Sequence, residues 1–259
     1  MEFAVTRSSA VLCLLVLAIL WAVPRQVAGA NGADLLRLLD LAEKSYAGVQ
    51  DYTSIMLGRE RIGGVLRPQE TILLKFQRPF KVYMKWLEGP SKGREGLYVS
   101  GAREGKFLLY EPRGIRRLFT AALDPSDQRI MEQSRHPVTD VGIGRLLEIV
   151  GENARRGTKN GVLQVTDRGI AELAGRRVRT LEGMLPRDPK LAYYCYRVIL
   201  SFDEENHLPI RVAVYDWDDQ MVEEYIHTAL QVNPGFTGRD FDPANGDYGF
   251  SGWRINISG

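Results

Sequence analysis

Three histidines are the residues in this sequence best suited to acid–base or metal chemistry: His136, His207 and His227. None stands in an HExxH or HxH pattern or beside a cysteine, so their spacing predicts no zinc site. His136 is the most distinctive, because Arg135 precedes it and Pro137 follows it. Such a histidine can act as a general base or can hydrogen-bond a nearby helix end. The second role is the simpler expectation.

Motifs for nucleotide binding and nucleophilic catalysis are incomplete. The run Gly142-Ile-Gly144-Arg-Leu-Leu147 begins like a dinucleotide-binding loop, but Leu147 stands where the third glycine belongs and no βαβ context surrounds it. The sequence has no GxxxxGK, and in Gly249-Phe-Ser-Gly252 the second glycine comes one position too early for a nucleophile elbow. The sequence therefore predicts a non-enzymatic protein without a cofactor.

The acidic segment 240–247 resembles a calcium-binding loop only in part. An EF-hand needs Asp or Asn at its fifth position, glycine at its sixth and glutamate at its twelfth, where this chain has Ala244, Asn245 and Ser251. Asp and Asn also favour turns, because their side chains hydrogen-bond the backbone two residues on. We expect a turn rich in these residues and no metal.

Two charged motifs, Arg59-Glu60-Arg61 and Gly93-Arg94-Glu95, fall on neighbouring predicted strands. Carboxylates there could take part in catalysis. Cross-strand ion pairs on a solvated face of a sheet explain the pattern at least as well.

The first thirty residues have the pattern of a cleavable signal peptide. Arg7 is followed by an apolar run over residues 10–23, and Ala28-Gly29-Ala30 is a typical cleavage site. The run is shorter than the roughly 20 residues of a membrane span. We expect cleavage after Ala30, a periplasmic location and a single domain over residues 31–259, with no membrane span after cleavage. The alternative is an uncleaved N-terminal anchor.

The mature chain has no strong charge and one thiol. Cleavage removes two of 34 basic and one of 32 acidic residues, so the net charge falls to +1 and gives no indication of nucleic-acid binding. It also removes Cys13, which leaves Cys195 without a partner for an internal disulfide. Tyrosines flank Cys195 closely, which predicts a buried thiol on a packed strand. A dimer bridged through Cys195 is the alternative.

Most of the mature chain alternates between apolar and polar residues, the period of strands. Helical spacing occurs at 34–47, 128–134 and 141–154. We therefore predict a mainly β (α+β) fold, in which one curved antiparallel sheet of about eleven strands forms a half-barrel and about three helices cover its concave face. The other face is expected to be polar and to meet water.

The alternation also selects a candidate ligand-binding surface. Lys81 and Lys85 should point to water, so the apolar residues between them face the opposite side of the strand. The same argument applies to the neighbouring strand and to a strand predicted over 193–203. The expected binding residues are Ile72, Leu74, Phe76, Val82, Met84, Trp86, Tyr194, Tyr196, Leu200 and Phe202. The alternative is that these side chains only fill the core.

Several segments, in order, resemble a bacterial family of exported proteins known as domain of unknown function 1571. They are residues 51–53, 59–61, 79–86, 93–98, 134–137 and 240–250. The order of strands and helices is also similar to that of the LolA and LolB lipoprotein carriers, whose helix-covered half-barrel holds acyl chains. This resemblance implies a LolA-like domain, and a shared fold gives only a hypothesis about function.

Two functions from different classes are consistent with these observations. The first is a periplasmic carrier that holds a hydrophobic ligand, either a lipid or a lipoprotein acyl chain, between sheet and helices. The second is a module of the same fold that binds or senses an envelope protein without a lipid. A continuous apolar cavity would favour the carrier, a filled core with an exposed patch the module, and a cleft joining His136 to carboxylates an enzyme.

Overall fold

The alternating segments form one twelve-stranded antiparallel sheet in the computed structural model, which describes residues 32–114 and 118–250. The strands are β1 (Asp51–Ile62), β2 (Val65–Leu66), β3 (Glu70–Gln77), β4 (Lys81–Glu88), β5 (Glu95–Val99), β6 (Phe107–Tyr110), β7 (Thr120–Leu123), β8 (Gln164–Leu173), β9 (Arg176–Met184), β10 (Arg197–Asp203), β11 (Pro209–Tyr215) and β12 (Met221–Val232). The predicted signal peptide, its cleavage site and Ser251 lie outside the described residues.

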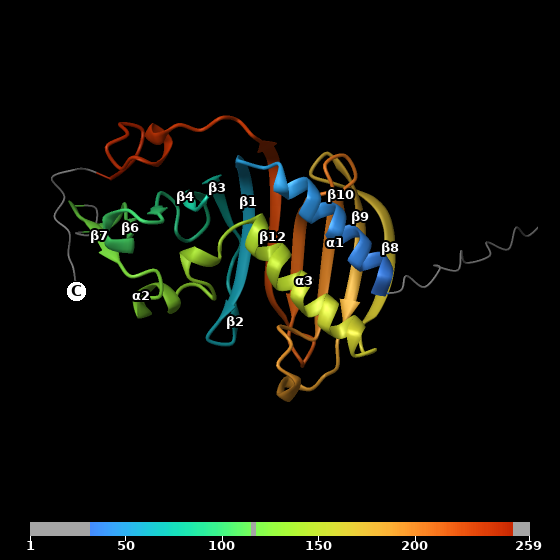
Figure 1. The fold of residues 1–259 in the computed structure, drawn as a ribbon. Helices are drawn as coiled ribbons and strands as arrows, with labels where there is room; N and C mark the ends of the chain where they lie inside the picture. The colour runs from blue at the N-terminus through green and yellow to red at the C-terminus, as the bar shows by residue number, and fades with distance from the viewer. Residues whose placement is uncertain (1–31, 115–117, 251–259) are drawn as a thin grey trace, which may run out of the picture.

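Strands from the two ends of the chain meet in the middle of the sheet. The order is β7-β6-β5-β4-β3-β1-β12-β11-β10-β9-β8, and β2 pairs with β1 as a short hairpin. From β3 to β7 and from β8 to β12 sequential strands are neighbours. β1 pairs with both β3 and β12, and the consecutive strands β7 and β8 form the two opposite edges of the sheet. The sheet curves around the helices and stays open (Figure 1). The predicted half-barrel is therefore confirmed.

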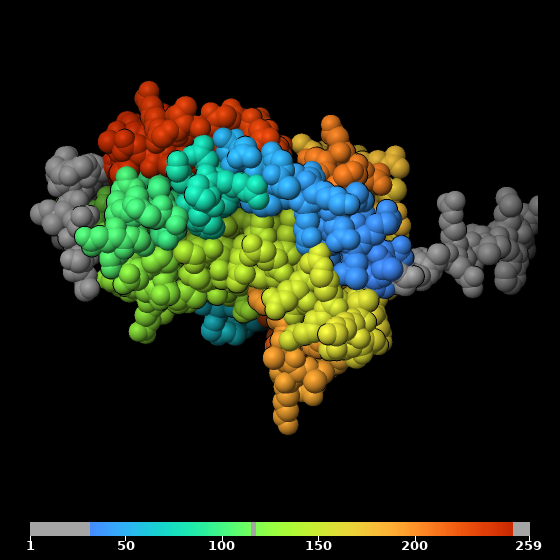
Figure 2. Space-filling view, in the orientation of Figure 1, coloured from blue at the N-terminus to red at the C-terminus, as the bar shows by residue number. Residues whose placement is uncertain are grey.

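Helices α1 (Gly32–Ala47) and α3 (Ile143–Lys159) lie side by side over the concave face, and the short α2 (Gln128–Met131) precedes α3 (Figure 1). Leu35, Leu39 and Ala42 of α1 are fully buried, as the helical spacing requires. Arg155 of α3 donates to Glu43 of α1 at 2.8 Å on the solvent side. Side chains of these helices and of the segment between α2 and α3 cover the sheet (Figure 2).

One predicted strand differs from the structure. The strand expected over 193–203 begins only at Arg197, because Tyr193 and Tyr194 turn toward α3: Asn160 Nδ2 donates to the Tyr193 hydroxyl at 3.1 Å, and the Tyr194 N–H donates to Asn153 Oδ1 at 3.0 Å. Cys195 is buried as predicted but does not lie on a strand.

The convex face is not polar throughout, which corrects the expectation for it. Over β4, β5 and β6, the cross-strand neighbours Tyr83, Leu97 and Leu108 are buried beneath Phe241 and Phe250. The alternation of apolar and polar residues shows which side chains point to the convex face. It does not show that a C-terminal segment covers them.

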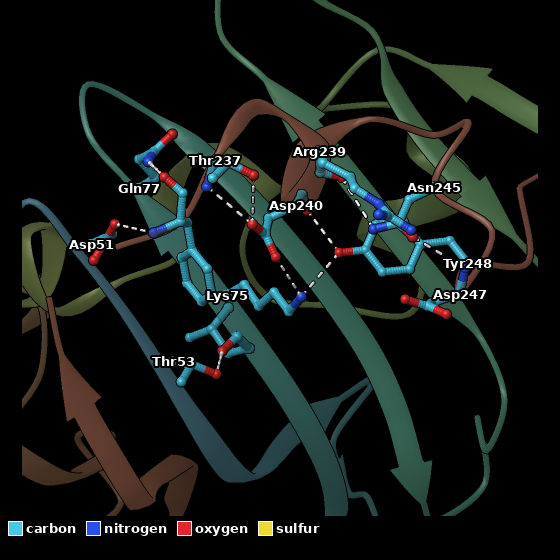
Figure 3. Close-up of polar contacts among 12 residues, drawn as sticks. Asp51, Thr53, Lys75, Gln77, Thr237, Arg239, Asp240, Asn245, Asp247 and Tyr248 are labelled. Carbon is cyan, nitrogen blue, oxygen red and sulfur yellow. Dashed lines mark hydrogen bonds and ion pairs between the residues drawn. The ribbon is translucent and has the colours of Figure 1, made fainter. Parts of the chain in front are cut away.

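A lysine fastens that C-terminal segment to the sheet. Lys75 Nζ donates to Asp240 Oδ1 at 3.0 Å and to the Tyr248 hydroxyl at 3.2 Å (Figure 3). The expected Asx-rich turn is confirmed, since Asp242 Oδ1 accepts from Ala244 N–H at 2.9 Å and Asn245 Oδ1 from Asp247 N–H at 3.1 Å. The side chains of Asp240 and Asp242 thus hold the segment in its fold. Within the described ranges no group of three or more His, Cys, Asp or Glu is placed to hold a metal.

Candidate functional site

A cavity of about 490 Å³ lies between the concave face and the helical layer. This volume is within the range of roughly 300–1,000 Å³ that is typical of small-molecule sites. The apolar side chains that border it come from both layers: Met56, Ile72, Met84, Trp86, Phe107, Leu109, Val198, Val212 and Val214 from the sheet, and Ile130, Leu146, Ile149 and Val150 from the helices. The structure therefore contains a continuous and largely apolar space.

The ten residues expected to bind ligand divide into three groups. Ile72, Met84, Trp86 and Tyr194 border the cavity. Another five are buried in the adjoining core: Leu74, Phe76, Val82, Leu200 and Phe202. Tyr196 packs away from it, with the Arg187 guanidinium 4.3 Å from the centre of its ring.

The position of the start of α3 explains why side chains fill the space at one end of the concave face, whereas the other end borders the cavity. The Ile143 N–H donates to the Tyr52 hydroxyl at 3.1 Å, which brings the helix down onto the sheet beside Phe76. Gly142 makes this approach possible, because a Cβ there would lie 3.0 Å from the Tyr52 hydroxyl and 3.3 Å from the Phe76 ring. Alternation identified the correct face, but the position of α3 along the strands determines where the cavity lies.

Two glutamates lie at the floor of the cavity in the middle of the sheet. Glu60 of β1 and Glu223 of β12 are direct cross-strand partners, and both border the cavity. Glu223 is 3% exposed. Like charges placed opposite each other in an antiparallel pair repel, so the pair needs compensating donors.

Those donors come from the segment between α2 and α3 and from two tyrosines. Arg135 donates from its backbone N–H to Glu60 at 2.7 Å and from Nε to Glu223 at 3.0 Å. His136 Nε2 lies 2.7 Å from Glu223 Oε2. The Tyr194 hydroxyl donates to Glu223 Oε1 at 2.7 Å, and the Tyr225 hydroxyl donates to Glu60. The expectation that His136 bonds a helix end is therefore wrong.

The charges in this cluster stabilise one another. Burial alone would lower the pKa of His136, but its hydrogen bond to Glu223 and the charges of Glu223 and Glu60 raise the pKa above its ordinary value. Burial would raise the pKa of Glu223, but His136, Tyr194 and Arg135 together lower it. Burial, followed by the charge of Glu223, raises the pKa of Tyr194. These shifts favour an ionised Glu223 beside the Arg135 guanidinium and a protonated His136.

The two charged motifs of the sequence have mixed outcomes. Arg59 forms the expected cross-strand ion pair, with Glu224 at 2.8 Å, whereas its neighbour Glu60 points to the cavity. Glu95 also forms a cross-strand ion pair, with Lys85 at 3.0 Å, but it is buried rather than solvated. It accepts as well from the Tyr83 hydroxyl at 3.0 Å and from the Gly249 N–H at 2.8 Å. Sequence reasoning missed Glu223 and Tyr225, although their spacing of two residues along β12 places both on one face.

A hydrogen-bonded pair of a second histidine, His227, and a serine, Ser54, lies beside the cavity. His227 borders it and accepts or donates a 2.8 Å hydrogen bond to the hydroxyl of Ser54, which is 1% exposed. Burial lowers the pKa of His227 to about 4, so it is neutral at ordinary pH. A serine so completely enclosed is poorly placed to attack a substrate, and the pair fits a satisfied polar contact in the core.

An open, curved antiparallel sheet with helices over its concave face and a cavity between the layers defines the LolA-like half-barrel class. Within that class, the chain belongs to the family described as "Protein of unknown function (DUF1571)", whose model matches residues 49–250. A search of curated proteins found no match.

Several solved structures are similar to this chain. The lipoprotein LppX of Mycobacterium tuberculosis matches with a TM-score of 0.50 and 10% identity over 82% of this chain and 100% of its own. MucB matches with a TM-score of 0.47 and 17% identity over 81% of this chain, which spans 62% of MucB. A LolA superfamily protein from Nitrosomonas europaea has a TM-score of 0.37 and 10% identity over 80% of this chain and 96% of its own. At these identities the likeness to LppX concerns the fold alone.

Proposed function

We propose that this protein is a non-enzymatic periplasmic binding or carrier protein that holds a hydrophobic ligand, a lipid or a lipoprotein acyl chain, between its sheet and helices. The observation that carries the proposal is the apolar cavity of about 490 Å³. No helix among the described residues is both long and apolar enough to cross a membrane.

The energetics of the cavity favour an alkyl chain as its occupant. Burying one methylene group is worth about 0.8 kcal/mol, so a chain of about ten methylenes gains about 8 kcal/mol before the costs of association. Ile72, Met84 and Trp86 supply one apolar wall and α3 supplies the other. Because Trp86 and Tyr194 are only partly buried, a ligand could add to their burial.

The polar cluster is the observation that bears on an enzymatic alternative. It joins His136 to carboxylates at a cavity, as a catalytic site would. A general base, however, works best when it is unprotonated near the working pH. The raised pKa of His136 and the lowered pKa of Glu223 favour a stable ion pair instead. We therefore assign the cluster an anchoring role.

Native mass spectrometry of the protein purified from its own periplasm, followed by uptake of a fluorescent fatty acid, tests the carrier function. We expect co-purified lipid and saturable uptake that unlabelled fatty acid displaces. Val212→Trp, which fills the cavity from the middle of the sheet, should abolish uptake, whereas Val65→Trp on the exposed β1–β2 hairpin should not. A folded protein without lipid or saturable uptake would contradict the carrier function and favour the envelope-protein module.

The cleavage site and the location need a separate measurement. Mass-spectrometric sequencing of the exported protein should find Asn31 at its N-terminus. Membrane-embedded material with an intact Met1 would contradict both proposals.

A further inference from the structure

The segment between α2 and α3 is the part of the helical layer that lies over the opposed glutamates. We call residues 132–142 the cover, and several of them border the cavity, including Gln133, His136 and Val141. Several contacts besides those to the glutamates hold the cover in place. Gln133 Oε1 accepts from Arg94 at 2.8 Å, Val138 is buried in the core, Val141 packs against that core, and the His136 ring stacks on Tyr194. The contacts of the cover with β1 and β12 are polar and charged: Arg135 and His136 meet Glu60 and Glu223.

The two glutamates beneath the cover repel each other unless cations neutralise them. Glu60 and Glu223 repel each other across β1 and β12, and Glu223 is almost fully buried. Glu223 forms ion pairs with Arg135 and His136, and both cations belong to the cover. Lifting the cover would leave two opposed carboxylates in an apolar cavity, so closure is coupled to neutralisation of the glutamates.

We propose that residues 134–137 form a pH-sensitive latch, in which the proton on His136 controls how firmly the cover closes the cavity. The latch rests on the proposed function in one respect: it regulates exchange of the ligand that the cavity holds. Its structural part, the pH-dependent closing of the cover, can be measured without any ligand.

The direction of the effect follows from the groups that face His136. Glu60 lies on β1, Glu223 and Tyr225 lie on β12, Tyr194 precedes β10, and Arg135 is on the cover itself. The glutamates stabilise the protonated ring and Arg135 opposes it, and the net effect is a raised pKa. Below that pKa the imidazolium compensates Glu223. As the pH rises through it, this charge is lost and the cover loosens.

The first measurement needs no ligand. Hydrogen exchange of the mature protein, corrected for the intrinsic effect of pH, should show residues 132–142 opening more at pH 8.5 than at pH 5.5. We expect a change on the order of fivefold, the lower end of ordinary coupling between sites. His136→Gln should remove this dependence, and His207→Gln, in the hairpin between β10 and β11, should retain it. Equal opening at both pH values in the wild type would overturn the latch.

A second readout covers the case in which His136→Gln does not fold. The NMR titration of His136 should give a pKa above 6.5 in the wild type, and Glu223→Gln should lower it. An unshifted or lowered wild-type value would also overturn the latch.

The third readout separates the latch from the carrier function. The dissociation rate of a bound fluorescent fatty acid should rise with pH in the wild type and not in His136→Gln. If the protein binds no fatty acid but the cover still opens with pH, the carrier function fails and the latch stands. If fatty acid binds and neither the cover nor the dissociation rate responds to pH, the latch fails and the carrier function stands.

Discussion

The guanidinium of Arg94 lies against the indole ring of Trp86, 5.6 Å from the ring centre, where both residues border the cavity. The Trp86 N–H also donates to the Arg94 carbonyl oxygen at 3.0 Å, which joins the two residues through the backbone. Such cation–π contacts contribute about 0.5–1 kcal/mol at partly exposed sites. Trp86 is therefore held in place while one side of it remains available to the cavity.

This placement predicts that Trp86→Ala affects binding more than stability. Truncation of a fully buried aromatic side chain costs about 3–5 kcal/mol, and half-buried Trp86 should cost less. Phe76→Ala is the matched control, because Phe76 is 4% exposed in the core of the same face. It should lose the full 3–5 kcal/mol. Chemical unfolding and fatty-acid uptake, measured on both variants, check the difference. If Trp86→Ala also loses the full 3–5 kcal/mol and the wild type takes up no fatty acid, the Trp86 side of the cavity is ordinary core.

Cys195 should be slow to react in the folded protein. Burial, followed by the charge of Glu223, raises its thiol pKa to about 12. At pH 8 the thiolate fraction is then roughly a thousandfold lower than for a thiol with the ordinary pKa of about 8.5. Labelling of residues 31–259 with a maleimide should be slower by about that factor in buffer than in urea. Rapid native labelling, or a dimer that only reductant dissociates, would contradict this burial.

His227 should make the protein less stable in mild acid. Its pKa is lowered to about 4 by burial, against about 6.5 in an unfolded chain. Between those values the unfolded state binds more protons, so the free energy of unfolding falls as the pH falls, by up to about 3 kcal/mol. His227→Asn removes the titration and keeps an acceptor for Ser54. Urea unfolding from pH 7 to pH 4 should show a smaller acid loss in the variant, and parallel curves would contradict the assignment.

The sequence allowed most of the architecture to be predicted and less of the site. Alternation along β3 and β4 identified the concave face because Lys75 and Lys81 cannot be buried without partners. The same pattern could not show that Lys75 meets Asp240 beneath a C-terminal segment, since that contact joins residues 165 positions apart. Likewise, nothing local to Glu60 indicates that Glu223 stands opposite it. Pairing of the first strand with the last is a property of topology, and single-strand periodicity does not contain it.

The end of the cavity nearest Gly142 gives a final prediction about how the space is closed. Gly142 has φ +120° and ψ 158°, a region open essentially to glycine alone, and a Cβ there would lie 3.0 Å from the Tyr52 hydroxyl. Gly142→Ala therefore adds a steric conflict to backbone strain. Gly63→Ala is the matched control: Gly63 also has a positive φ, +58°, but its Cβ would meet nothing within 4 Å.

We expect Gly63→Ala to cost about 1 kcal/mol and Gly142→Ala about 2 kcal/mol or more, from the typical 1–3 kcal/mol of such strained positions. Because the conflict pushes α3 away from Tyr52 and Phe76, the Gly142 variant should also open the sealed end of the cavity. Unfolding in urea measures the first effect, and hydrogen exchange of the Ile143 N–H, which donates to the Tyr52 hydroxyl, measures the second. If the two alanine variants lose equal stability and Ile143 stays protected, close packing of Gly142 does not determine where the cavity ends.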